Sequence, residues 1–150
     1  TASEERTTIA VTSQVLQQEA PTMNERVLRN AARGAIRILV DINAQRAFLL
    51  VGDRIAIETP ISSARAGKET PRGTFRITEK VERNKVSTIY GVALPYWMRL
   101  DGSAIGLHVG ALPGLPASAG CIRLPEEVAQ LFFKYAKSGT TVQILNRLAQ

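Results

Sequence analysis

The sequence predicts a mostly β domain with one main internal helix at about 125–137. Apolar and polar residues alternate in several short segments between residues 36 and 145, which is typical of half-buried strands. Gly- and Pro-containing stretches separate these segments. One stretch alone repeats its apolar residues at clear helical spacing, and it is long enough for about three turns.

Length and composition indicate one domain that can fold without covalent or metal cross-links. The chain has 150 residues, 45% of them hydrophobic, with one Cys and one His. A chain of this length buries roughly 70% of its unfolded surface. A single Cys excludes an internal disulfide, and one Cys with one His argues against a structural zinc site, so we expect no metal. No apolar run reaches about 18 residues, so no membrane-spanning helix is expected, and a signal peptide is absent or already removed.

Residues 1–34 are predicted to be an N-terminal extension or linker, partly helical, in front of a main domain at 35–150. Residues 1–20 are interpreted as a tail or a marginal helix. Thr22 and Glu25 fit a capping box, in which the two side chains satisfy each other's backbone amides. The short helix that follows is expected to run to about Arg33 and to end at Gly34.

The main domain is predicted to be built from short strands. Gly52-Asp53 separates two of them and favours a two-residue hairpin, because a type II′ turn needs positive φ at its first position. Asp101-Gly102-Ser103 indicates a turn. The predicted strands are residues 36–42, 48–51, 54–57, 74–81, 90–97, 104–109 and 140–145.

The helix is predicted from its first turn, its stripe and its end. Pro125 suits the first turn, and Glu126 and Glu127 are favourable at the positive end of the helix dipole. Gly139 can end the helix. One apolar stripe at i, i+3, i+4 and i+7 consists of Val128, Leu131, Phe132 and Tyr135.

The only His and the only Cys flank a loop. Residues 110–120 hold two Pro and three Gly and cannot be regular structure, with His108 before them and Cys121 after them. A nucleophilic thiol needs a nearby base, because a free thiol titrates at about 8.5. On spacing alone, both residues are more often incidental. Ser118 is a weaker nucleophile candidate, and Asp101 is better explained by its turn than as a partner of His108.

The net charge of +6 lies entirely within 35–150 and is densest at 65–85. This surplus favours anionic partners, although a solvated surface explains the segment equally well. Aromatic residues make up 5% of the chain, which is low for stacking on single-stranded nucleic acid.

Three motifs, in order along roughly 36–146, resemble the L,D-transpeptidase (YkuD-type) catalytic domains. Residues 105–110 and 117–125, on the two sides of the loop, resemble the active-site signature: a His, a loop, then Ser/Thr-His-Gly-Cys. Residues 70–75 resemble the family's TPxGTF segment, and residues 94–99 resemble its MPYWMR stretch.

The resemblance implies a β-sandwich or barrel-like domain and assigns roles to individual residues. Cys121 would be the nucleophile and His108 its general base, oriented by a backbone carbonyl at Val109. Gly120 and Cys121 would supply oxyanion amides, and Arg123 would hold a substrate carboxylate. The remaining substrate-binding candidates are Ser118, Tyr96 and Trp97.

The resemblance also implies a substrate and a place. The family's Cys attacks a tetrapeptide stem of peptidoglycan and releases the terminal D-Ala. An amine then resolves the acyl-enzyme, giving a 3→3 cross-link or a protein attachment, and water gives carboxypeptidase activity. We therefore expect peptidoglycan stem peptides as partners, no nucleic acid, no cofactor, a monomer, and a periplasmic or cell-wall location.

One departure keeps an alternative open. The family's second His, directly before Gly-Cys, is Ala119 here. A low-activity or non-catalytic peptidoglycan-binding homologue is therefore the second hypothesis, and an unrelated Cys-dependent hydrolase is the third.

Overall fold

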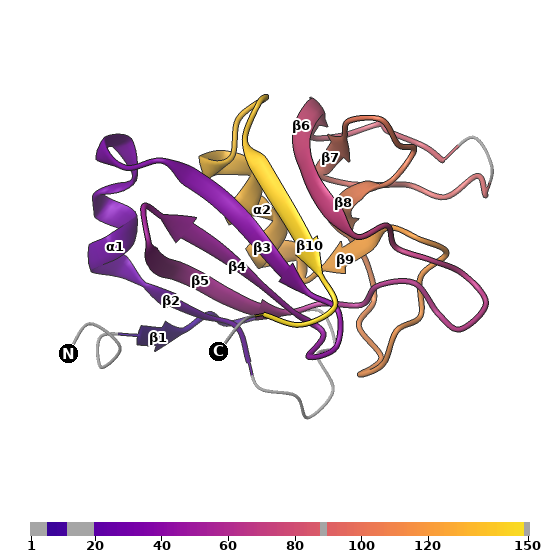
Figure 1. Ribbon diagram of the computed structural model, residues 1–150, viewed down its shortest axis with the longest axis horizontal. Helices are drawn as coiled ribbons and strands as arrows, with labels where there is room; N and C mark the ends of the chain where they lie inside the picture. The colour runs from indigo at the N-terminus through magenta and orange to yellow at the C-terminus, as the bar shows by residue number, and fades with distance from the viewer. Residues whose placement is uncertain (1–5, 12–19, 88–89, 149–150) are drawn as a thin grey trace.

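The computed structural model describes residues 6–11, 20–87 and 90–148. They form a mostly β fold with one main helix, as predicted. One sheet has the order β1-β2-β5-β4-β3-β10-β6-β7-β8-β9 (Figure 1). The strands are β1 (Arg6–Thr8), β2 (Thr22–Asn24), β3 (Ile36–Asp41), β4 (Arg46–Val51), β5 (Arg54–Pro60), β6 (Gly73–Val81), β7 (Trp97–Leu100), β8 (Gly106–Val109), β9 (Ile122–Leu124) and β10 (Thr141–Leu145). The helices are α1 (Glu25–Arg29), the 3-10 helix η2 (Ala31–Arg33) and α2 (Glu126–Tyr135).

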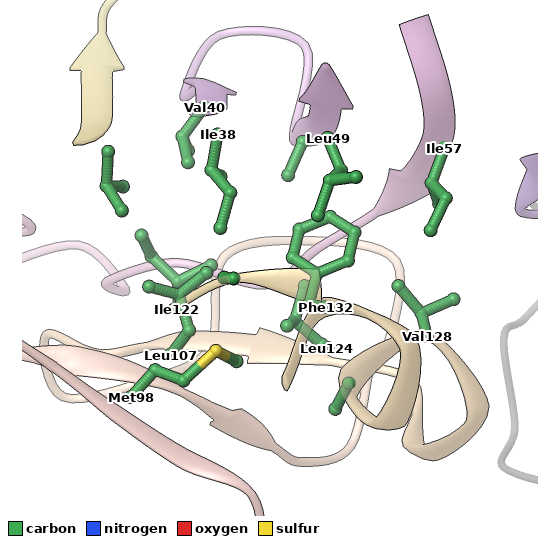
Figure 2. Packing of buried hydrophobic residues seen from close by; sticks show 14 of the residues in the cluster. Ile38, Val40, Leu49, Ile57, Met98, Leu107, Ile122, Leu124, Val128 and Phe132 are labelled. Carbon is green, nitrogen blue, oxygen red and sulfur yellow. The ribbon is translucent and has the colours of Figure 1, made fainter. Parts of the chain in front are cut away.

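The sheet bends so that its two parts face each other across one core. Figure 2 shows side chains of β3, β4 and β5 above those of β7, β8, β9 and α2, with Phe132 of α2 between the layers. Phe132 is fully buried. The arrangement is therefore sandwich-like, although the strands belong to one continuous sheet.

β10 joins the two parts of the sheet. It pairs parallel with β3 and antiparallel with β6, so it lies in the middle of the sheet although it is the last strand in sequence. The hairpin of β4 and β5 forms around Gly52, whose φ of 62° matches the positive φ that the predicted turn requires.

α2 confirms the predicted helix, with slightly narrower bounds. Pro125 precedes its first residue, and Val128, Ala129 and Phe132 are buried on its inner face. Lys80 of β6 closes its other end: the Nζ atom donates to the carbonyl of Phe133 and, at 2.6 Å, to that of Ala136. Helix carbonyls at this end have no partner within the helix, so the ammonium group satisfies them.

The predicted helix start at Thr22 is wrong. Thr22 lies in β2, and Asn24 is the N-cap, its side-chain oxygen accepting from Val27 N at 3.2 Å. Asn is an equally good N-cap, and the pairing of β2 with β5 holds Thr22 extended. α1 ends at Arg29, and η2 follows it. Val27 and Leu28 are buried in the common core. The prediction of a tail or marginal helix falls partly on residues 12–19, outside the described residues.

The strand predicted at 90–97 is also misplaced, because β7 begins at Trp97. Before it, Gly91 N donates to Ser87 O in a turn, Pro95 has no amide hydrogen, and Tyr96 adopts a φ of 55°. These features interrupt a ladder that apolar alternation alone suggests. Within the described ranges, no helix is long and apolar enough to cross a membrane.

Candidate active site

The parallel pair of β8 and β9 brings His108 and Cys121 to one face of the sheet. His108 is in register with Arg123, and Leu107 with Ile122. Successive side chains of a strand point to opposite faces, so the fully buried Leu107 and Ile122 face the core while His108 and Arg123 face the other way. Cys121 directly precedes β9 and lies two residues before Arg123. Its thiol receives a hydrogen bond from the backbone of Gly106 in β8, two residues before His108, and strand alternation continued from β9 puts it on the His108 face.

His108 is held in one orientation by the backbone. Its Nδ1 lies 2.7 Å from the carbonyl oxygen of Val109. A carbonyl only accepts, so Nδ1 carries the hydrogen and the lone pair of the neutral ring is on Nε2. The side chain is buried, and this burial lowers its pKa below the ordinary 6.5, with the positive charge of Arg123 acting in the same direction. The ring is therefore a neutral base at pH 7.

Cys121 is a free thiol whose surroundings favour the protonated form. Burial raises its pKa above the ordinary value, while a hydrogen bond from the backbone of Gly106 and the charge of Arg123 partly oppose that rise. Neutral thiol and neutral imidazole are therefore the resting forms. Such a thiol becomes a nucleophile only when a base takes its proton during attack.

Trp97 lies beside His108, and a hydrogen bond to Glu79 holds its indole in place. The two ring centroids are 6.1 Å apart, and the indole covers Gly106, where a Cβ would come within 2.8 Å of the ring. The indole Nε1 donates to Glu79 Oε1 at 2.8 Å, and Lys85 Nζ lies 3.2 Å from the same oxygen. The indole hydrogen bond and then Lys85 lower the pKa of Glu79, so this carboxylate stays ionised.

Tyr96 and Arg123 make contacts that the sequence does not predict. The ring of Tyr96 packs edge-on against Phe133 of α2, with centroids 5.4 Å apart. The stem of Arg123 lies across Gly110, and its guanidinium donates to the carbonyls of Ala111 and Ala117 at 3.3 Å each. Arg123 thus bridges the two ends of the 110–120 loop, while its charge reaches both His108 and Cys121.

Ser118 and the Gly120 amide are hydrogen-bonded to each other within the loop. Ser118 is only 2% exposed, and its hydroxyl donates to Cys121 O and accepts from Gly120 N at 3.1 Å. The hydroxyl is thus used within the loop rather than offered to a ligand, and the Gly120 N–H is already bonded. Gly120 has a φ of 149°, and a Cβ there would lie 2.7 Å from Ile105 Cδ1, so the position requires glycine.

Three residues of this region were not singled out from the sequence: Gly106, Glu79 and Thr70. Thr70 is buried, and its Oγ1 donates to Gly120 O at 2.7 Å. The sequence could have indicated Thr70, because it lies in the Thr-Pro segment that resembles the family. Gly106 also lies in a segment that resembles the family, residues 105–110, whereas Glu79 carries no such signal, because only the strand register brings it to Trp97.

Much of the basic segment 65–85 is used to hold the fold. Arg72 donates to Thr70 O and to Asn146 Oδ1, and Arg76 donates to Gly139 O at 3.1 Å. Arg65 and Lys68, by contrast, are exposed on a loop that bonds to the 110–120 loop through Arg65 N and Ser118 O. In the part of the chain that the structure describes, no three His, Cys, Asp or Glu side chains gather as a metal site would need.

A bent mixed sheet with His108 on β8 and Cys121 directly before the parallel strand β9 is the arrangement that the sequence resemblance leads us to expect for an L,D-transpeptidase catalytic domain. The family model for the L,D-transpeptidase catalytic domain, YkuD, matches residues 35–144. The chain belongs to this family, whose members are enzymes.

Individual relatives agree with this assignment. A Bacillus licheniformis protein that carries the name L,D-transpeptidase YkuD is 29% identical over 120 residues, which are 78% of this chain and 70% of that protein. A solved L,D-transpeptidase from Stackebrandtia nassauensis is 27% identical, with a TM-score of 0.68 over 77% of this chain and 58% of that chain. One from Enterococcus faecium, carrying a Cys-to-Ser substitution, is 26% identical, with a TM-score of 0.64 over 74% of this chain. This chain covers 50% of the latter, so it spans only part of the solved relatives.

Proposed function

We propose that the protein is a peptidoglycan L,D-transpeptidase in which Cys121 forms an acyl-enzyme with a tetrapeptide stem. One observation carries the proposal. Val109 O fixes the hydrogen of His108 on Nδ1, which leaves Nε2 as a base on the face that also carries Cys121. The lowered pKa of His108 keeps this base unprotonated at neutral pH.

The proposed first step is the attack of Cys121 on the carbonyl carbon that precedes the terminal D-Ala. His108 Nε2 takes the thiol proton as the Sγ–C bond forms, and the carbonyl π electrons move to the oxygen. Collapse of this tetrahedral intermediate breaks the C–N bond, and His108 returns the proton to the leaving D-Ala amine. The product is a thioester on Cys121 with both catalytic groups back in their resting forms.

In the second step, an amine attacks the thioester carbonyl while His108 Nε2 takes its proton. Collapse of the tetrahedral intermediate then breaks the C–Sγ bond, and the proton returns to Cys121 Sγ. The acceptor is a second stem, giving a 3→3 cross-link, or a protein amine, and water in its place gives hydrolysis. Arg123 is proposed to pair with a substrate carboxylate, since its charge already acts on both His108 and Cys121. Trp97 is proposed as a wall of the site. The protein would act as a monomer in the periplasm or at the cell wall.

Two related structures suggest a direct probe. One is a complex of an L,D-transpeptidase with imipenem, and another is a carbamoyl enzyme formed with avibactam. Both ligands contain a strained cyclic carbonyl that a nucleophile can open. If Cys121 is such a nucleophile here, imipenem should acylate it.

The experiment is intact-mass analysis after incubation with imipenem, followed by turnover of a stem tetrapeptide. We expect the wild-type protein to gain one imipenem mass and to release D-Ala, and Cys121→Ala to do neither. Absence of both adduct and D-Ala release from the folded wild-type protein would contradict the proposal.

The second candidate is a low-activity or non-catalytic peptidoglycan-binding homologue. It is favoured by Ala119, which stands where the family motif has a second His, together with the raised pKa of the Cys121 thiol. Ala119→His and Cys121→Ala distinguish the two forms of this second candidate. A large gain in acylation rate over a slow wild-type protein supports the low-activity form. Sacculus binding that is unchanged in Cys121→Ala, without any turnover, supports the non-catalytic form.

A further inference from the structure

We infer that Thr70 is a positioning residue that aims the Cys121 N–H as the oxyanion donor of the acyl-transfer step. The inference rests on the proposed function and deepens it. Thr70 lies in the loop between β5 and β6, fifty residues before the Gly120–Cys121 peptide that it contacts. Its side chain is 1% exposed, so it touches no substrate and can act only through that peptide.

The hydroxyl of Thr70 both donates and accepts a hydrogen bond. It donates to Gly120 O at 2.7 Å and accepts from Ala64 N at 3.0 Å. A hydroxyl has one hydrogen to give, so the acceptor role toward Ala64 directs that hydrogen to Gly120 O. Ala64 in turn forms a bridge with Ser118, which anchors the Thr70 loop to the loop that carries Gly120.

The Thr70 bond orients the whole Gly120–Cys121 peptide plane. The described residues contain no cis peptide bond, so the Gly120 C=O and the Cys121 N–H point in opposite directions across a planar unit. With the carbonyl fixed on buried Thr70, the Cys121 N–H is directed away from the Thr70 loop. Rotation of this plane would swing the N–H away from its direction and break the bond to Thr70.

The neighbouring polar groups leave only this donor. Gly120 N–H is bonded to Ser118 Oγ, and Cys121 O accepts from the same hydroxyl. None of the hydrogen bonds among the described residues uses the Cys121 N–H. A tetrahedral intermediate on Cys121 Sγ places its oxyanion close to the backbone of Cys121 itself. A fixed N–H at that position stabilises the developing charge without reorganisation.

The test separates a reaction that develops an oxyanion from one that does not. Imipenem acylation passes through a tetrahedral oxyanion at Cys121, whereas alkylation by iodoacetamide does not. Thr70→Val keeps the shape of the side chain and removes the hydroxyl. We expect acylation to slow about 10- to 100-fold, somewhat less than the roughly 10²- to 10³-fold loss on deleting a donor. The alkylation rate of the same variant should stay within about twofold of wild type.

Two further variants serve as controls. Thr70→Ser retains the hydroxyl and should restore the wild-type acylation rate. Gln45→Met loosens the same loop from another side, because Gln45 bonds to Ser63 through its side-chain amide, but it leaves the Thr70–Gly120 bond intact. It should therefore leave the ratio of acylation to alkylation unchanged even where it lowers the melting temperature.

The outcomes distinguish this inference from the proposed function. A wild-type protein that is not acylated overturns the function, whereas equal acylation of wild type and folded Thr70→Val overturns the role of Thr70. Should Thr70→Val fail to fold, a structure of the wild-type imipenem adduct decides. A carbonyl oxygen within hydrogen-bond distance of Cys121 N supports the inference, and a carbonyl held elsewhere overturns it.

Discussion

At the scale of single residues, two opposite pKa shifts on one face decide how the site would work. Burial lowers the pKa of His108 and raises that of Cys121. An ion pair of thiolate and imidazolium would require shifts in the reverse directions. The structure therefore favours general-base activation during attack over a preformed thiolate.

General-base activation and a preformed thiolate predict different pH dependences of the Cys121 reactions. His108 must be neutral to accept a proton, and its lowered pKa means that the neutral form persists below pH 6.5. We expect the imipenem acylation rate to rise through that acidic range and to be level from about pH 7 to 8. Alkylation by iodoacetamide depends on the thiolate, so it should keep rising through and beyond the ordinary thiol pKa of about 8.5.

The control is His108→Ala. It should lose the acylation plateau and keep an alkylation profile that still rises above pH 8. Alkylation of the wild-type protein that saturates below pH 7 would show a preformed thiolate and would contradict the general-base assignment.

At the scale of elements, Gly106 determines how closely β7, β8 and the Trp97 indole can pack. A Cβ at Gly106 would lie 2.5 Å from the carbonyl oxygen of Met98 and 2.8 Å from Trp97. One of these neighbours is backbone in a strand and cannot move without disturbing the ladder. We expect Gly106→Ala to lower the free energy of unfolding by about 1 to 3 kcal/mol, as overpacking typically does.

Gly110→Ala is the matched comparison for this prediction. Its Cβ would lie 2.7 Å from Cγ and 2.8 Å from Cδ of Arg123, so its nearest contacts are all side-chain atoms, whereas that of Gly106 is a backbone oxygen. Urea unfolding should show a smaller loss for Gly110→Ala than for Gly106→Ala. Equal losses for the two variants would contradict the proposed tight contact at Gly106.

The elements that sequence predicts well are those with a strong local pattern. The alternation of β3, the Gly52 turn of the first hairpin and the apolar stripe of α2 each needs only neighbouring residues. β1 and β2 have three residues each: β2 pairs with the edge of β5 and β1 pairs with β2, and no local pattern encodes either pairing. The start of β7 was missed because apolar residues continue through a turn that ends at Tyr96.

The same distinction applies to the candidate site. His108 and Cys121 stand out in the sequence because each residue type occurs once, next to a Pro/Gly loop. The hydrogen bond between Ser118 and Gly120 and the one between Thr70 and Gly120 are not visible in the sequence. The second depends on how two loops that are distant in sequence meet. The role of Gly106 depends on strand register. Contacts of this kind follow from tertiary packing, so composition and spacing could not supply them.

At the scale of the whole molecule, the positive charge divides into two kinds. Arg72, Arg76 and Lys80 donate to carbonyl or amide oxygens of the fold, although Arg72 and Arg76 are themselves exposed, and Lys68 is exposed on the loop beside Ser118. Exposed charge is what attracts an anionic polymer from a distance. Arg65 and Lys68 are therefore among the exposed charges of 65–85 that we expect to attract cell-wall material, and they lie on the loop that bonds to the 110–120 loop.

We expect Lys68→Glu to weaken binding to isolated sacculi, with the difference shrinking as salt is raised, because salt screens exposed charges. Arg54→Glu is the matched control. It makes the same charge change at an exposed position, the first residue of β5, at the other end of that strand from the Lys68 loop. Co-sedimentation of the two variants with sacculi at low and high salt measures the effect. Equal weakening by both would show that net charge alone matters.

The central place of β10 bears on how the domain assembles. This strand is the last of the sheet in sequence, yet it lies between β3 and β6. Until β10 inserts, no continuous series of paired strands connects the β4–β5 hairpin to the strands around His108. Pairings between residues 37–41 and 141–145 close a loop of about a hundred residues, which is a slow step in folding. A ribosome-bound chain that ends before residue 141 would therefore lack the joined sheet that supports Cys121. The Cys121 thiol would reach its folded surroundings only late in synthesis.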